Sequence, residues 1–260
     1  MRQNFTTVDG YRVRYIEAGT SNKNIVCLHG LGASADRWSK TIPILAKKYH
    51  VIAPDMIGFG YSDKPEISYT VDFFVDFIKK FVEKLEMKNL ILVGASLGGH
   101  VALETVLTYN NVEKLVLVSP AGIMKESTPV LTHYIAAAIY PTFENAKKVF
   151  QEMTGDGKVD ETYTRDFVNR MQLPNAKYAF MSSVLGSKAA PVLTDRLHRI
   201  KVPTLIMWGR KDALIPVKFA RKFHAGIQGS KLVVMEECGH TPYFETPERF
   251  CDIVLEFLRS

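Results

Sequence analysis

The sequence is poor in cysteine and in long apolar runs. Its three cysteines, Cys27, Cys238 and Cys251, are odd in number, far apart and without CxxC spacing. That spacing argues against a disulfide framework and a zinc knuckle, and it favours a reducing compartment. The most apolar later run, residues 134–140, is far shorter than the roughly 20 residues that span a bilayer. Residues 1–10 also lack the apolar core of a signal peptide. We therefore expect a cytoplasmic protein without a membrane span.

Clustered charge and cofactor-binding motifs are lacking too. The formal net charge is +6, but lysine and arginine are spread along the chain, which argues against nucleic acid as a partner. Neither a P-loop lysine nor an HExxH helix is present, and the glycines after residue 93 do not have G-x-G-x-x-G spacing. We expect no cofactor, no metal and a small-molecule substrate. The oligomeric state, monomer or homodimer, stays open.

What the sequence does contain is an alternation of buried strands and amphipathic helices. Short runs rich in valine, isoleucine and leucine are typical of strands buried on both faces of a parallel sheet. The segment 4–19 predicts a hairpin that turns at Asp9-Gly10. These patterns predict an α/β fold with an antiparallel edge. The expected strands lie at 24–30, 49–55, 90–96, 114–120, 203–209 and 231–237, and the clearest helices at 71–87, 99–109 and 247–260.

Residues 122–195 interrupt this alternation. They contain no convincing strand, several aromatic residues and four prolines. A structureless loop of that length is uncommon in a compact domain. We interpret the segment as a helical insertion between two strands of the sheet.

The motif G-x-S-x-G occurs at Gly94-Ala95-Ser96-Leu97-Gly98. By itself it is weak, since a chain of this length has roughly a one-in-ten chance of containing it. Here it lies directly after an expected strand and before an expected helix, where the chain must turn sharply and expose the serine. Gly94 and Gly98 would relieve the crowding. Ser96 is therefore a candidate nucleophile.

A serine hydroxyl needs a base to remove its proton and an acid to orient that base. Among seven histidines, His240 lies in a glycine-containing loop just after the last expected strand. In this arrangement the acid lies between serine and histidine in chain order. Asp212 follows another buried strand, whereas the alternative strand end at 116–122 carries no acid. Asp55 precedes Ser96, so we assign it a structural role.

An acyl-transfer site also needs two fixed donors for the developing oxyanion. The backbone amide of Leu97 lies at the start of a helix, directly after the serine. The loop HGLGAS at 29–34 places the amide of Leu31 after an earlier strand. We expect these two amides to form an oxyanion hole, with Ser96, His240 and Asp212 as a catalytic triad.

Together, HGLGAS, APDMIGFGYSDKP, GASLGG, WGRKDALIP and ECGHTPYFETPERF resemble the α/β-hydrolase fold family over almost the whole chain. The resemblance implies an eight-stranded, mostly parallel sheet flanked by helices, with a helical cap inserted after strand 6. It divides the chain into a core (residues 1–121 and 196–260) and a cap (residues 122–195). Within the family, LVSPAGI and ECGH are similar to carboxylesterases and monoacylglycerol-lipase-like enzymes.

Other branches of the family leave alternatives. Haloalkane dehalogenases and epoxide hydrolases use an aspartate nucleophile, so Ser96 argues against both. Carbon-carbon bond hydrolases of meta-cleavage pathways keep the serine triad, but they often carry tryptophan where this chain has Thr241. They also place an arginine in the cap, and Arg170 could fill that position. Perhydrolases, enol-lactone hydrolases and a non-catalytic binding protein remain further alternatives.

We favour a carboxylesterase that acts on small to medium acyl esters. The residues expected to bind substrate are Tyr134, Ile139, Arg170 and Phe180. Other apolar residues of the same segment are expected to roof the acyl pocket or to pack the cap onto the sheet: Ile135, Tyr140, Phe143 and Met181. The physiological substrate depends on the shape of the cap, which one sequence does not specify.

Overall fold

A computed structural model describes residues 1–259, and its centre is one eight-stranded sheet in the order β1-β2-β4-β3-β5-β6-β7-β8. The pairs β1·β2 and β2·β4 are antiparallel, and the other five are parallel. This confirms the predicted mostly parallel sheet. The strands are β1 (Arg2–Val8), β2 (Tyr11–Ala18), β3 (Asn24–Leu28), β4 (His50–Pro54), β5 (Leu90–Ala95), β6 (Val112–Val118), β7 (Thr204–Gly209) and β8 (Lys231–Met235).

The sheet has the burial that its sequence pattern predicts. Every residue of β3, β5 and β7 is buried, because helices cover both faces of the central strands. The hairpin between β1 and β2 turns at Asp9 and Gly10, which have φ angles of 50° and 83°. Two consecutive residues with positive φ suit the right-handed twist of the paired strands.

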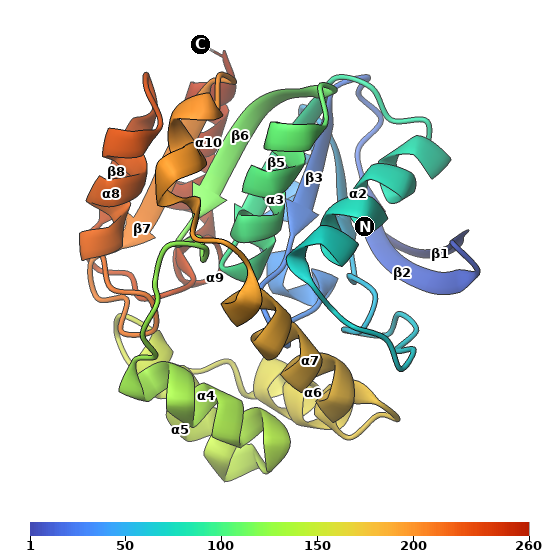
Figure 1. The fold of residues 1–260 in the computed structure, drawn as a ribbon, viewed down its shortest axis with the longest axis vertical. Helices are drawn as coiled ribbons and strands as arrows, with labels where there is room; N and C mark the ends of the chain where they lie inside the picture. Colours follow the sequence, from blue (N-terminus) through green and yellow to red (C-terminus); the bar gives the residue numbers. More distant parts are fainter. Residues whose placement is uncertain (260) are drawn as a thin grey trace.

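Helices lie on both sides of the sheet, with α2, α3 and α8 in front and α10 behind in Figure 1. Helix α2 begins after Thr70, whose hydroxyl accepts a hydrogen bond from the Phe73 amide. Helix α1 packs against α10. The elements outside the insertion are the 3₁₀ helices η1 (Ala35–Trp38) and η2 (Leu193–Arg199) and the helices α1 (Ile42–Leu45), α2 (Val71–Lys84), α3 (Leu97–Thr108), α8 (Lys218–Gly226), α9 (Pro242–Glu245) and α10 (Pro247–Arg259).

In the described chain, four α-helices, followed by η2, separate β6 from β7: α4 (Pro129–Ile139), α5 (Phe143–Met153), α6 (Glu161–Met171) and α7 (Ala176–Ala189). They gather beyond the carboxyl ends of the parallel strands, at the bottom of Figure 1. Three of them begin at residues whose side chains accept a hydrogen bond from the first turn: Thr128, Thr142 and Asp160. We call α4–α7 the four-helix insertion.

Aromatic rings hold the four-helix insertion together. The Tyr134 ring centroid lies 5.8 Å from that of Phe167 and 5.9 Å from that of Phe180. The Tyr134 hydroxyl also donates a 2.6 Å hydrogen bond to the carbonyl of Leu31, in the loop after β3. The aromatic cluster therefore fixes the insertion to the loop that crosses the strand ends. Within residues 1–259, no helix is both long and apolar enough to cross a membrane.

Candidate active site

Ser96 occupies the sharp turn between β5 and α3. Its backbone has φ 54° and ψ −118°, a strained combination for a residue with a side chain. The glycines around it allow the turn. A Cβ on Gly94 would lie 2.4 Å from the carbonyl oxygen of Gly98, and a Cβ on Gly98 would lie 2.4 Å from that of Leu28. Only glycine fits at either position, and the turn presents the serine side chain beyond the end of the sheet.

His240 and Asp212 come from two later strand ends and meet directly. The His240 Nδ1 atom lies 2.8 Å from Asp212 Oδ2, and both side chains are almost fully buried. The other carboxylate oxygen accepts hydrogen bonds from the amides of Leu214 and Ile215, at 3.0 and 2.8 Å. The two amides fix the orientation of the Asp212 carboxylate. Its second oxygen therefore holds the imidazole in one orientation, with Nδ1 protonated.

The loop that carries His240 is held from both sides by Glu245, which was not predicted as a site residue. One Glu245 oxygen accepts from the amides of Gly155 and Gly239, at 2.8 and 2.9 Å. The other oxygen accepts from the amide and the hydroxyl of Thr241, at 3.0 and 3.2 Å. The His240 amide itself donates to the carbonyl of Met153 in α5, at 2.8 Å. The four-helix insertion therefore contributes directly to the position of His240.

Of the two predicted oxyanion donors, Leu97 directly follows the serine in the chain and Leu31 lines the same pocket. Leu97 is the first residue of α3, where helix amides have no partner within the helix. Leu31 follows Gly30, and a Cβ on Gly30 would lie 3.2 Å from Ser96 Cβ. Neither amide donates a hydrogen bond to another residue of the described chain. Their role as oxyanion donors stays a prediction.

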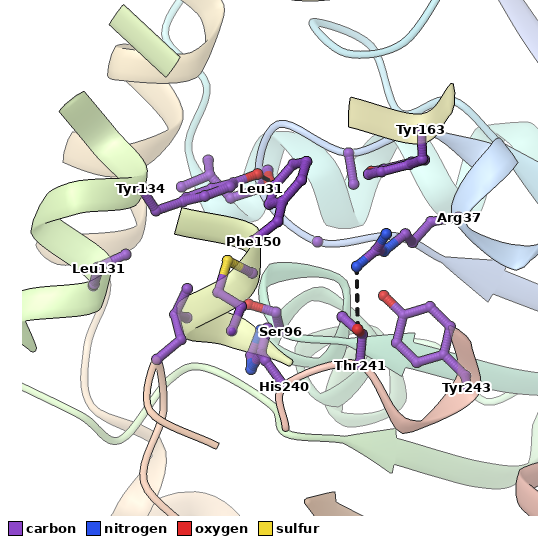
Figure 2. Close-up of a pocket in the computed structure, with 14 residues that line it drawn as sticks. Leu31, Arg37, Ser96, Leu131, Tyr134, Phe150, Tyr163, His240, Thr241 and Tyr243 are labelled. Atoms are coloured by element: carbon purple, nitrogen blue, oxygen red, sulfur yellow. Dashed lines mark hydrogen bonds between the residues drawn. The ribbon is translucent and has the colours of Figure 1, made fainter. Parts of the chain in front are cut away.

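Ser96 and His240 line one pocket of about 60 Å³, between the sheet and the four-helix insertion. Figure 2 shows both at its base, with Tyr134 and Phe150 from the insertion opposite them. No hydrogen bond joins Ser96 to His240 among the described residues. In a site without substrate such a bond is often long, and it tightens when substrate binds. The pocket wall is mostly apolar, so an apolar substrate group would be shielded from water there.

The four predicted substrate-binding residues are not all in this pocket. Tyr134 lines it, whereas Ile139, Arg170 and Phe180 do not. Ile139 is the last residue of α4 and packs half-buried against the core. Phe180 is fully buried above Gly32, where an added Cβ would lie 2.8 Å from its ring. Arg170 is 2% exposed and forms an ion pair with Asp166.

Arg37 in η1 is a pocket residue that the sequence reasoning missed. It lines the same pocket as Ser96 and His240, and it donates a 3.1 Å hydrogen bond to the hydroxyl of Thr241 (Figure 2). Nothing in the local sequence distinguishes this arginine from the other basic residues. Its place in the wall depends on how η1 packs against α5, α6 and the His240 loop.

Two other strand-end groups have structural roles. Asp55 is fully buried and accepts hydrogen bonds from the amides of Ala35 and Tyr61, at 2.6 and 2.8 Å, while Arg14 forms an ion pair with it. His29 is also buried and accepts a 3.0 Å hydrogen bond from the Met56 amide. Burial lowers the pKa of His29 below its usual value, so it stays neutral. These contacts hold the loops after β3 and β4 beside the pocket.

Within residues 1–259, no group of three or more histidine, cysteine, aspartate or glutamate side chains is arranged to hold a metal ion.

Comparisons with known proteins agree with this architecture. A family model described as "Alpha/beta hydrolase family" matches residues 25–253. The 2-hydroxy-6-oxo-6-(2'-aminophenyl)hexa-2,4-dienoic acid hydrolase of Metapseudomonas resinovorans is 33% identical, over 98% of this chain and 90% of its own length.

Two solved structures with different activities are similarly close. A meta-cleavage product hydrolase from Pseudomonas fluorescens has a TM-score of 0.89 and 28% identity, covering 98% of this chain and 97% of the other. An esterase from Exiguobacterium antarcticum has a TM-score of 0.87 and 25% identity, covering 100% of both chains. Because the family model covers most of the described sheet and the Ser96, Asp212 and His240 positions, this chain belongs to the alpha/beta hydrolase family.

Proposed function

We propose that the protein is a serine hydrolase that cleaves carboxylic esters of small to medium acyl groups through an acyl-enzyme intermediate. The observation that carries this proposal is the pocket in which Ser96 and His240 meet, with His240 bound to the buried Asp212 carboxylate. The strained turn at Ser96 supports it, because the serine is held in the pocket at a cost in backbone energy.

In the proposed reaction, Ser96 Oγ attacks the ester carbonyl while His240 Nε2 takes its proton. The carbonyl electron pair moves onto oxygen, and the Leu31 and Leu97 amides stabilise the resulting oxyanion. Collapse of the intermediate expels the alcohol, which takes the proton from His240. Water then attacks the acyl-enzyme with His240 again as base, and the acid leaves. Asp212 stabilises the imidazolium throughout and stays ionised.

We further propose that residues 122–195 act as a cap over a core formed by residues 1–121 and 196–260. The hydrogen bond from Tyr134 to Leu31 and the contact of the His240 amide with Met153 support this proposal, since both fix helices of the insertion above the strand ends. The pocket beneath is small. Its volume is about 60 Å³. Short acyl chains would fit best.

Carbon-carbon bond hydrolysis of a meta-cleavage product is the second candidate. It is favoured by the likeness to the hydrolases from Metapseudomonas resinovorans and Pseudomonas fluorescens. The position of Arg170 argues for the ester reaction instead. Arg170, the proposed counterpart of the cap arginine of those enzymes, lies outside the pocket wall and is paired with Asp166.

Side-by-side kinetics would separate the two reactions. The protein would be assayed with p-nitrophenyl butyrate and with 2-hydroxy-6-oxo-6-(2'-aminophenyl)hexa-2,4-dienoate, and Ser96→Ala would serve as the control. We expect ester turnover that Ser96→Ala abolishes and little turnover of the dienoate. A larger kcat/KM for the dienoate, also lost in Ser96→Ala, would establish the carbon-carbon reaction instead.

A further inference from the structure

Arg37 is a buried cation in the wall of the Ser96 pocket. The residue is 6% exposed, and it lines the pocket together with Ser96 and His240. Arginine is rarely buried to this extent unless it is paired. The environment of its guanidinium therefore needs an explanation.

No acidic side chain of the described chain forms an ion pair with Arg37. Its guanidinium carbon lies 4.0 Å from the ring centroid of Phe244 and 4.2 Å from that of Tyr163, and the guanidinium donates a hydrogen bond to the Thr241 hydroxyl. Aromatic faces attract a cation but do not accept the directed hydrogen bonds of its five N–H groups. Carboxylates of the described residues therefore accept none of the hydrogen bonds that this arginine can donate.

The nearest carboxylate in the hydrogen-bond network, Glu245, does not fill this role. Its two oxygens already accept from the amides of Gly155, Gly239 and Thr241 and from the Thr241 hydroxyl. Glu245 reaches Arg37 only through that hydroxyl, which lies next to His240 in the chain. The two aromatic rings and Thr241 hold the guanidinium in place without neutralising it.

We propose that Arg37 binds a carboxylate carried by the substrate, so that the enzyme prefers esters that are also anions, such as half-esters of short dicarboxylic acids. This inference rests on the proposed ester hydrolysis and names its substrate class. A planar carboxylate matches the guanidinium fork and can take two hydrogen bonds from it. Because Arg37 and Ser96 line the same pocket, we expect a short spacer between the carboxylate and the ester carbonyl.

Lys40 offers a matched control. Its ammonium lies 3.9 Å from the centroid of the same Phe244 ring, and it lines a neighbouring pocket that includes Arg37 but not Ser96. Its side chain is 43% exposed, and it forms an ion pair with Asp160. Lys40→Gln therefore removes one positive charge close to Arg37 without changing the wall that faces the serine.

The test compares monomethyl succinate, glutarate and adipate with neutral methyl esters in which an isopropyl group replaces the carboxylate. Hydrolysis is followed by pH-stat titration at pH 7.5, where the carboxylates are ionised. For the best spacer, we expect kcat/KM to favour the anion by about 10- to 100-fold in the wild type and in Lys40→Gln. In Arg37→Gln the ratio should fall close to one. Arg37→Lys, which keeps the charge but loses the fork, should give an intermediate ratio.

Each contrary outcome has a distinct meaning. If all three neutral esters are preferred, if Arg37→Gln keeps the anion preference, or if Lys40→Gln loses it equally, the assignment of Arg37 is overturned. If Arg37→Gln does not fold, an unchanged ratio in Arg37→Lys also overturns it. Fluorophosphonate labelling of the wild type distinguishes a failure of the Arg37 assignment from a failure of the proposed function. A labelled Ser96 without anion preference overturns only the role of Arg37, whereas no labelling and no ester turnover overturn the proposed function as well.

Discussion

Met153 offers a way to enlarge the acyl pocket by a known amount. It is the last residue of α5, it is almost fully buried, and its side chain lines the pocket with Ser96 and His240. Replacing it with alanine removes three heavy atoms from the wall. The backbone carbonyl that accepts from the His240 amide remains in the variant, so the position of the imidazole should be retained.

The size of the effect follows from the transfer free energy of methylene groups. The space released has room for about three methylenes, each worth ~0.8 kcal/mol when buried. Their sum of ~2.4 kcal/mol corresponds to a gain of about 60-fold in the kcat/KM of p-nitrophenyl heptanoate relative to butyrate. Met153→Ala should lower the free energy of unfolding by ~2 kcal/mol or less. That is the lower end of the range for such truncations, because the side chain already borders a cavity.

The assay is the ratio of kcat/KM for the two p-nitrophenyl esters. Wild type should prefer butyrate, Met153→Ala should shift strongly toward heptanoate, and Met153→Leu, which nearly conserves volume, should stay near wild type. An unchanged ratio in Met153→Ala, or an equal shift in Met153→Leu, would refute the reasoning that this pocket holds the acyl chain.

Three other substitutions test separate parts of the site. Asp212→Asn should keep the fold but lower kcat by about 10⁴-fold, because an amide favours the wrong His240 tautomer; a loss under tenfold in steady-state kinetics would argue against the triad. Gly98→Ala should lower the free energy of unfolding by about 1–3 kcal/mol, because its Cβ would lie 2.4 Å from the Leu28 carbonyl oxygen; an unchanged urea midpoint would contradict this. Burial, assisted by nearby Arg196, lowers the pKa of His100 from 6.5 to about 4, so only the unfolded chain binds the proton as pH falls from 6.5 to 4. Wild type should therefore lose about 3 kcal/mol more over that range than His100→Leu, and parallel curves of stability against pH would count against the shift.

The sequence predicted the framework of this site well, for a local reason. Buried strands, the glycines around Ser96 and the loops after β7 and β8 are each recognisable within a few residues. Because parallel strands end at one edge, Ser96, Asp212 and His240 could be assigned to a common site before any contact was known. The observed strand bounds differ from the predicted ones by one or two residues. The same is true of helix α3, which begins at Leu97.

The pocket wall was much less predictable. Which face of a cap helix turns inward depends on packing between helices, so Tyr134 lines the pocket while Phe180 is buried behind it against Gly32. Arg37 was missed because its partners, Tyr163, Thr241 and Phe244, lie more than 100 residues away in the chain. Local patterns carry no information about such contacts.

The central claim is that Ser96 is a nucleophile activated by His240. Labelling with a fluorophosphonate probe, followed by peptide mass spectrometry, tests it most directly. The account predicts one modified residue, Ser96, in the wild type, no labelling in Ser96→Ala, and labelling slowed by orders of magnitude in His240→Ala. Absence of labelling in the folded wild type, or equal labelling in Ser96→Ala, would contradict it.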